Sequence, residues 1–142
     1  MQHPFSASRR AWLWPFLIAG LIFVASDQSE LAGPSIAGLD KVTHFLVYGL
    51  LGTLVVRLGQ RRRAAWISLI VVSAYGLFDE WHQSFTPGRF VEAADWVADT
   101  AGAALAIVLY RSWGAYRRLL ETPLRRKRRI ENARAIATVS AP

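Results

Sequence analysis

Four apolar runs, separated by short polar segments, limit what this chain can fold into. A hydrocarbon core about 30 Å thick needs about 20 helical residues to cross it, and about 17 suffice when the flanking residues adapt. We expect spans at about 11–26, 42–58, 64–84 and 95–113, which together make residues 1–113 a membrane domain. A basic tail, residues 114–142, follows. The sequence therefore predicts an all-α, polytopic membrane protein built as a four-helix transmembrane bundle.

The basic residues indicate how these spans are oriented. If the N-terminus is cytoplasmic, 15 of the 17 Lys and Arg residues lie on the inner side, and only Lys41 and Arg89 lie outside. Cytoplasmic loops of membrane proteins carry such an excess, so we expect both termini to be cytoplasmic. The six tryptophans favour the headgroup level and fall near predicted span ends: Trp12, Trp14, Trp66, Trp81, Trp96 and Trp113.

The net charge of +7 first suggests a nucleic-acid partner, but such a protein should not carry membrane spans. We therefore expect no nucleic acid. The tail includes the basic run Arg125–Arg129 just beyond the last span, and such a segment attracts anionic lipid. The absence of cysteine excludes disulfides, thiolate metal sites and a cysteine nucleophile.

The first apolar run has two interpretations. Arg9-Arg10, the apolar stretch and Val24-Ala25-Ser26 are compatible with a signal peptide that ends in a small-residue cleavage site. Trp12, Trp14 and Pro15 instead suit a retained helix at the membrane edge, which is the interpretation we favour. Cleavage would leave the orientation of the other three spans unchanged.

Small residues recur at every fourth position of the last span, at Ala94, Ala98, Gly102 and Ala106. This spacing lets two helix backbones approach closely, which drives packing in lipid. We predict a helix–helix contact inside the bundle, with contact between two copies of the chain as the alternative.

Ionisable residues within spans are costly, and here they gather at one depth near the predicted outer surface. Helical spacing places some of them on common faces of their spans. These faces are Lys41, His44 and Tyr48 in the second span; Tyr75, Asp79, His82 and Gln83 in the third; and Asp95 and Asp99 in the fourth. We expect them to form a polar pocket that opens outward.

Several of these residues also have structural interpretations. Asp40 and Asp95 are typical helix N-caps. Lys41 can extend its ammonium group to the headgroups, and Glu80 and Arg89 can form an ion pair. The two histidines can be hydrogen-bonded packing residues. The adjacent pair Asp79-Glu80 is harder to explain in this way, since two acids inside a membrane edge need partners.

Three overlapping sets of candidate site residues follow from this polar cluster. The predicted ligand-binding residues are Lys41, His44, Tyr48, Asp79, Glu80, Gln83, Arg89, Asp95 and Asp99. Candidate metal ligands are His44, Asp79, His82 and Asp99, and candidate catalytic residues are Asp79, Glu80 and His44. No HExxH motif or nucleophile elbow is present, so motif spacing supports catalysis only weakly.

Two signatures in the chain resemble those of VanZ-like membrane proteins. The first is Asp40-Lys41-Val42-Thr43-His44-Phe45 with Tyr48, and the second is Tyr75-Gly76, Asp79-Glu80, Gln83, Phe85, Pro87-Gly88-Arg89, Asp95, Ala98 and Gly102. The chain has Asp99 where the family usually has Asn, and Ala106 where it often has Gly. The resemblance implies a multi-pass protein of the bacterial inner membrane, and the founding member is associated with resistance to the glycopeptide teicoplanin.

The predicted pocket suggests a function in the cell envelope, namely binding of a lipid or a cell-wall precursor, with Arg89 at a phosphate or carboxylate. The alternative is a membrane hydrolase or transferase that uses the same acids and histidines, with or without a metal. Transport is disfavoured because the inner halves of the spans are apolar.

Overall fold

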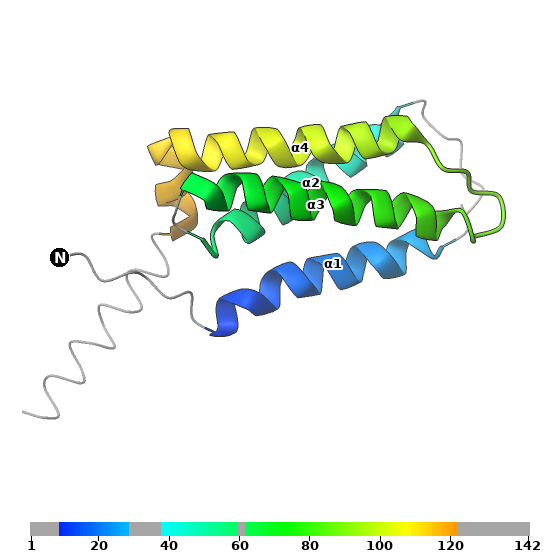
Figure 1. Cartoon of the computed structure of the whole chain (residues 1–142), viewed down its shortest axis with the longest axis horizontal. Helices are drawn as coiled ribbons and strands as arrows, with labels where there is room; N and C mark the ends of the chain where they lie inside the picture. Colours follow the sequence, from blue (N-terminus) through cyan, green and yellow to red (C-terminus); the bar gives the residue numbers. More distant parts are fainter. Residues whose placement is uncertain (1–8, 29–37, 60–61, 122–142) are drawn as a thin grey trace, which may run out of the picture. The chain divides into compact units, whose positions relative to one another are not determined.

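A computed structural model describes residues 9–28, 38–59 and 62–121. The elements are a 3-10 turn η1 (Arg9–Trp12) and four helices, α1 (Leu13–Ser26), α2 (Leu39–Val56), α3 (Arg62–Gln83) and α4 (Ala93–Ser112), as Figure 1 shows. These residues contain no strand, which confirms the all-α prediction for the part of the chain that is described. Each α-helix begins and ends within three residues of a predicted span.

Two of these helices, α2 and α4, are long and apolar enough to cross a membrane. Helix α1 is also apolar but has only 14 residues. Helix α3 has 22 residues, and its last turns carry Asp79, Glu80 and His82. Length and composition are therefore consistent with a membrane protein.

The distribution of side chains between surface and interior differs from that usual in a soluble domain. Acidic residues are usually exposed, yet four of them, Asp79, Glu80, Asp95 and Asp99, are buried here. Large apolar side chains are exposed on all four helices, among them Leu17, Leu21, Leu46, Leu50, Ile67, Ile70, Val97 and Leu105. Such a continuous apolar exterior is typical of a surface that contacts lipid.

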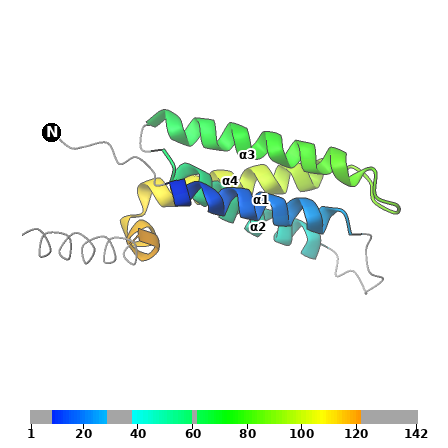
Figure 2. The same cartoon turned by 90° about the horizontal axis from the view of Figure 1, so that it is seen from below.

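The chain divides into two compact units, Met1–Ile107 and Val108–Pro142. In the first unit α1, α2 and α3 contact one another pairwise, which the two views in Figures 1 and 2 show. The buried core of this unit takes side chains from all four helices: Ile22, Tyr48, Leu51, Val72 and Ala103. A hydrogen bond of 2.6 Å from the Tyr75 hydroxyl to the carbonyl oxygen of Ala19 joins α3 to α1.

Helices α2 and α4 touch through their backbones. A methyl group added at Gly102 would lie 2.0 Å from the carbonyl oxygen of Phe45, and one added at Gly52 would lie 3.0 Å from the Cα of Ala103. Neither contact leaves room for a side chain. The small residues of α4 therefore serve a helix–helix contact within the chain, as the spacing predicted.

The predicted N-caps are wrong. Helix α2 begins at Leu39, and its N-cap is Gly38, which has a φ of 85° and provides no side-chain cap. Helix α4 begins at Ala93, so that Asp95 is its third residue. Asp40 and Asp95 both lie in a first turn, where a carboxylate still interacts favourably with the positive end of the helix dipole. Ion pairing with Lys41 gives each of them a second role.

The second unit contains the end of α4 and a further helical stretch at 114–121. Trp113 stacks on Tyr116, and the Tyr110 hydroxyl donates a hydrogen bond to the Glu121 carboxylate. The basic run Arg125–Arg129, for which we predict contact with anionic lipid, lies outside the described residues.

Candidate functional site

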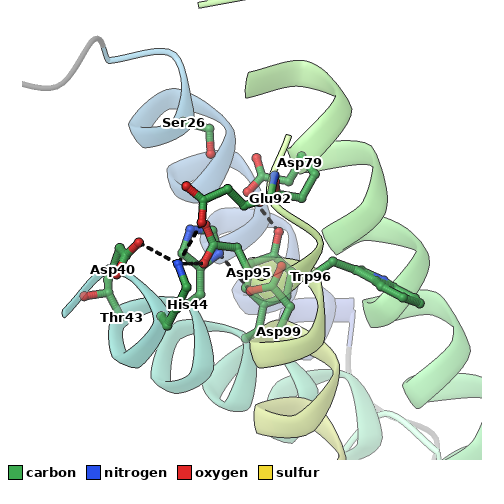
Figure 3. A network of polar contacts seen from close by, with 12 residues as sticks. Ser26, Asp40, Thr43, His44, Asp79, Glu92, Asp95, Trp96 and Asp99 are labelled. Carbon is green, nitrogen blue, oxygen red and sulfur yellow. Dashed lines mark hydrogen bonds and ion pairs between the residues drawn. The ribbon is translucent and has the colours of Figure 1, made fainter. Parts of the chain in front are cut away.

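Polar residues from three helices and the segment before α4 meet in one network, which we call the polar layer. Figure 3 shows part of it from close by. The nine residues predicted to bind a ligand all belong to it, and Glu92 joins them. Its members are Lys41, His44 and Tyr48 from α2; Asp79, Glu80 and Gln83 from α3; Arg89 and Glu92 from the connecting segment; and Asp95 and Asp99 from α4.

One side of the polar layer is a chain of hydrogen bonds centred on Asp79. Its Oδ2 accepts hydrogen bonds from the Tyr48 hydroxyl at 3.1 Å and from the Gln83 side-chain amide at 3.2 Å. Oε1 of Gln83 in turn accepts a hydrogen bond of 3.0 Å from Nη1 of Arg89. The Gln83 amide also lies 3.4 Å from the hydroxyl of Ser26, at the end of α1. This chain of contacts therefore joins α1, α2 and α3.

This side of the layer borders a cavity of about 400 Å³. Most of its wall is apolar and comes from α1 and α2, namely Ile18, Leu21, Ile22, Ala25, Val47 and Leu50. The rest of the wall is polar and consists of Ser26, Thr43, His44, Tyr48, Asp79, Gln83 and Arg89. Apolar and polar walls in one cavity match the two parts of an amphiphile.

The other side of the layer faces α4. Nδ1 of His44 lies 2.9 Å from Oδ1 of Asp99, which is completely buried. Gly76 of α3 makes room for this carboxylate, since a methyl group there would lie 2.8 Å from its Oδ2. Glycine at position 76 thus lets Asp99 lie against the backbone of α3.

Lys41 links the start of α2 to the start of α4. Its ammonium nitrogen forms ion pairs with Asp40 at 2.9 Å, Glu92 at 2.8 Å and Asp95 at 3.1 Å. The backbone N–H of Glu92 donates a hydrogen bond of 2.9 Å to Oε2 of Glu80. The segment between α3 and α4 is therefore held to both α2 and α3.

Several buried polar atoms of the layer have no hydrogen-bond partner in the described part of the chain. They are Asp79 Oδ1, Glu80 Oε1, Arg89 Nε and Asp99 Oδ2. A buried polar atom without a partner costs about 1–3 kcal/mol, more when it is charged. This site thus retains unused capacity to bind a ligand or an ion.

The structure separates His82 from Asp79, with which spacing had placed it on one face, and it gives Glu80 and Arg89 partners other than each other. His82 stacks on Phe23 of α1, with ring centroids 4.0 Å apart, and its Nδ1 has no hydrogen-bond partner among the described residues. Glu80 accepts the backbone N–H of Glu92, and Arg89 bonds to Gln83, so each has a partner other than the one proposed for an ion pair.

Sequence reasoning missed Glu92 and the wall that α1 contributes. Glu92 precedes Asp95 by three residues, a spacing that would have suggested a common side at the start of α4. The cavity-lining residues of α1 gave no signal, because Ile18 and Leu21 look the same in sequence whether they face lipid, a cavity or another helix.

The helical bundle, its apolar exterior and the buried acids near one end assign the protein to a class. This class is the small helical proteins whose composition suits a membrane. Within this class, a match to a family model shows which family the chain belongs to. The chain matches the family model described as VanZ/LLP1 over residues 2–114, and it belongs to that family. The match includes α1, which lies outside the two signatures. No curated protein and no solved structure matches the chain.

Proposed function

We propose that this VanZ-family protein crosses the bacterial inner membrane four times, with both termini in the cytoplasm, and binds a lipid or lipid-linked cell-wall precursor in its cavity. The apolar wall would hold the hydrocarbon chain, and the polar wall, which faces the outer side, would hold the headgroup. A link to teicoplanin resistance, with which the founding member of the family is associated, belongs to this proposal.

The observation that carries the proposal is the position of Arg89 in the cavity wall. Its Nη1 bonds to Gln83, while its buried Nε has no hydrogen-bond partner among the described residues. A guanidinium group binds phosphate or carboxylate through two parallel hydrogen bonds. Arg89 therefore supplies a positive contact for an anionic headgroup, beside walls that accommodate an acyl or prenyl chain.

We expect the Arg89→Ala variant to bind lipids with an anionic headgroup at least about tenfold more weakly than the wild type. A hydrogen bond to a charged group contributes about 1.5–3 kcal/mol, and about 1.4 kcal/mol corresponds to a factor of ten. The measurement is native mass spectrometry of the full chain in detergent, titrated in separate experiments with a polyprenyl phosphate and with phosphatidylglycerol. The two probes distinguish a cell-wall carrier from a bulk lipid.

Arg63→Ala is the matched control, because Arg63 is an exposed arginine in the first turn of α3 and does not line the cavity. This variant should bind like the wild type. The lipid affinity of Arg89→Lys should lie between those of the wild type and Arg89→Ala, since lysine keeps the charge but lacks the planar guanidinium group. Equal binding by wild type and Arg89→Ala for both lipids would contradict the proposal.

The orientation can be tested with single cysteines, because the chain contains none of its own. We expect Ser84→Cys, between α3 and α4, to react with a membrane-impermeant maleimide added to intact spheroplasts. We expect Leu58→Cys, at the end of α2, to react only after permeabilisation. The reverse pattern would refute the proposed orientation, and labelling of both positions from one side would refute a span between them.

A further inference from the structure

We propose that His44, Glu80 and Asp95 bind one divalent metal ion in the polar layer. One donor atom from each residue lies within 4.8 Å of the other two. The residues come from α2, α3 and α4, so an ion here would join three helices at a single point. Of the three residues only His44 also lines the cavity, whereas Glu80 and Asp95 do not, so metal binding can be tested without a lipid.

The state of Glu80 is the observation that points to an ion. This side chain is only 1% exposed, and its Oε1 has no hydrogen-bond partner among the described residues. Its other oxygen accepts the backbone N–H of Glu92, which holds the carboxylate in place. A buried carboxylate oxygen without a partner is unfavourable, and a metal ion would offset that cost.

His44 is oriented as a metal ligand usually is. Its Nδ1 lies 2.9 Å from the buried carboxylate of Asp99. With Asp99 ionised and His44 neutral, the carboxylate accepts this hydrogen bond, so that Nδ1 carries the proton and Nε2 keeps its lone pair. Metal-binding histidines commonly donate their second ring nitrogen to a carboxylate in this way. Asp99 is then a positioning residue and does not itself bind the ion.

A second group of acids in the layer already has its cation. Asp40, Glu92 and Asp95 also bring donor atoms within 4.8 Å of one another. All three form ion pairs with the ammonium group of Lys41 at 2.8–3.1 Å. Asp95 belongs to both groups and keeps its ion pair with Lys41, so the contrast rests on Glu80, whose Oε1 has no hydrogen-bond partner among the described residues.

The donor set indicates the class of metal. One imidazole and two carboxylates suit Zn²⁺ or Mn²⁺ better than Mg²⁺ or Ca²⁺, which prefer oxygen ligands alone. Bonds of about 2.1 Å in a tetrahedral site place the ligand atoms about 3.4 Å apart. The three side chains would therefore close in by about 1 Å around the ion, and water would complete the coordination.

The test is calorimetric titration of the full-length protein in detergent with zinc chloride after removal of bound metal by a chelator. We expect one Zn²⁺ per chain. Glu80→Gln, which keeps the size of the side chain, should weaken binding at least about 100-fold. Asp99→Asn should weaken it about 10- to 100-fold, because a carboxylate that orients a ligand typically contributes that much.

His82→Ala is the matched control, since it removes a histidine that lies outside the group. It should bind Zn²⁺ like the wild type. No saturable binding by the wild type, or equal affinity in Glu80→Gln, would overturn the proposal. If Glu80→Gln does not fold, X-ray absorption of the zinc-loaded wild type decides: one imidazole with oxygen ligands supports the site, and two imidazoles or none refute it.

Discussion

Replacing Gly102 by alanine is expected to push α4 away from α2 and to lower the stability of the bundle more than the same change at any other glycine in the described residues. The added carbon would lie 2.0 Å from the carbonyl oxygen of Phe45. This obstacle is backbone, so no side chain can rotate to relieve the contact. Overpacking a well-filled interior costs about 1–3 kcal/mol, and we expect the upper end of that range.

The effect should also reach the polar layer, because Phe45 directly precedes the turn that carries Tyr48 and directly follows His44. The measurement is the apparent melting temperature of the detergent-solubilised protein, followed by size-exclusion chromatography after heating. Gly20→Ala is the matched control, since a methyl group at Gly20 meets nothing within 4 Å. Alanine favours a helix over glycine by about 1 kcal/mol, so this control should be as stable as the wild type or slightly more stable. An unchanged melting temperature for Gly102→Ala would mean that α2 and α4 do not pack as described.

A bulky side chain placed in the cavity should weaken lipid binding even when Arg89 and the rest of the polar layer are intact. Ala25 lies on the apolar wall, in the last turn of α1, and is itself exposed. We expect Ala25→Trp to place its indole ring where the hydrocarbon chain would lie and to reduce binding at least about tenfold. Losing the burial of only two methylene groups would account for that factor, at about 0.8 kcal/mol each.

The same lipid titration by native mass spectrometry measures this effect. Gly20→Trp is the control, because position 20 is exposed on the same helix and does not line the cavity. This variant should bind lipid like the wild type. Binding by Ala25→Trp at wild-type strength, with a wild-type melting temperature, would show that the hydrocarbon chain does not occupy this cavity.

Much of the polar layer follows from helical spacing alone. Lys41, His44 and Tyr48 are separated by three and four residues, and Asp95 and Asp99 by four, so each set lies on one side of its helix whatever the tertiary fold. The depth of these residues follows from their distance to the span ends. The side of a helix on which a residue lies, and its distance from the end of that helix, each depend on one helix alone. The sequence is therefore sufficient to predict both.

Relations between helices could not be predicted in this way. Asp79 and Glu80 are neighbours in sequence, yet Asp79 borders the cavity and Glu80 bonds to the segment before α4. His82 lies three residues from Asp79, but its ring stacks on Phe23 of α1. The neighbour that a residue of α3 contacts depends on how the helices pack together. The spacing of residues within α3 carries no information about this packing.

The polar layer has a consequence for how the protein is made. Its partners lie far apart in the chain: 55 residues separate His44 from Asp99, and 51 separate Lys41 from Glu92. During translation α2 therefore emerges well before the carboxylates that pair with it. Helix α4 brings those carboxylates together with Gly102, which fits against Phe45. Helix α4 thus completes both the charge pairing and the close packing, and a nascent chain halted before residue 93 would present Lys41 to the insertion machinery without Asp95, and His44 without Asp99.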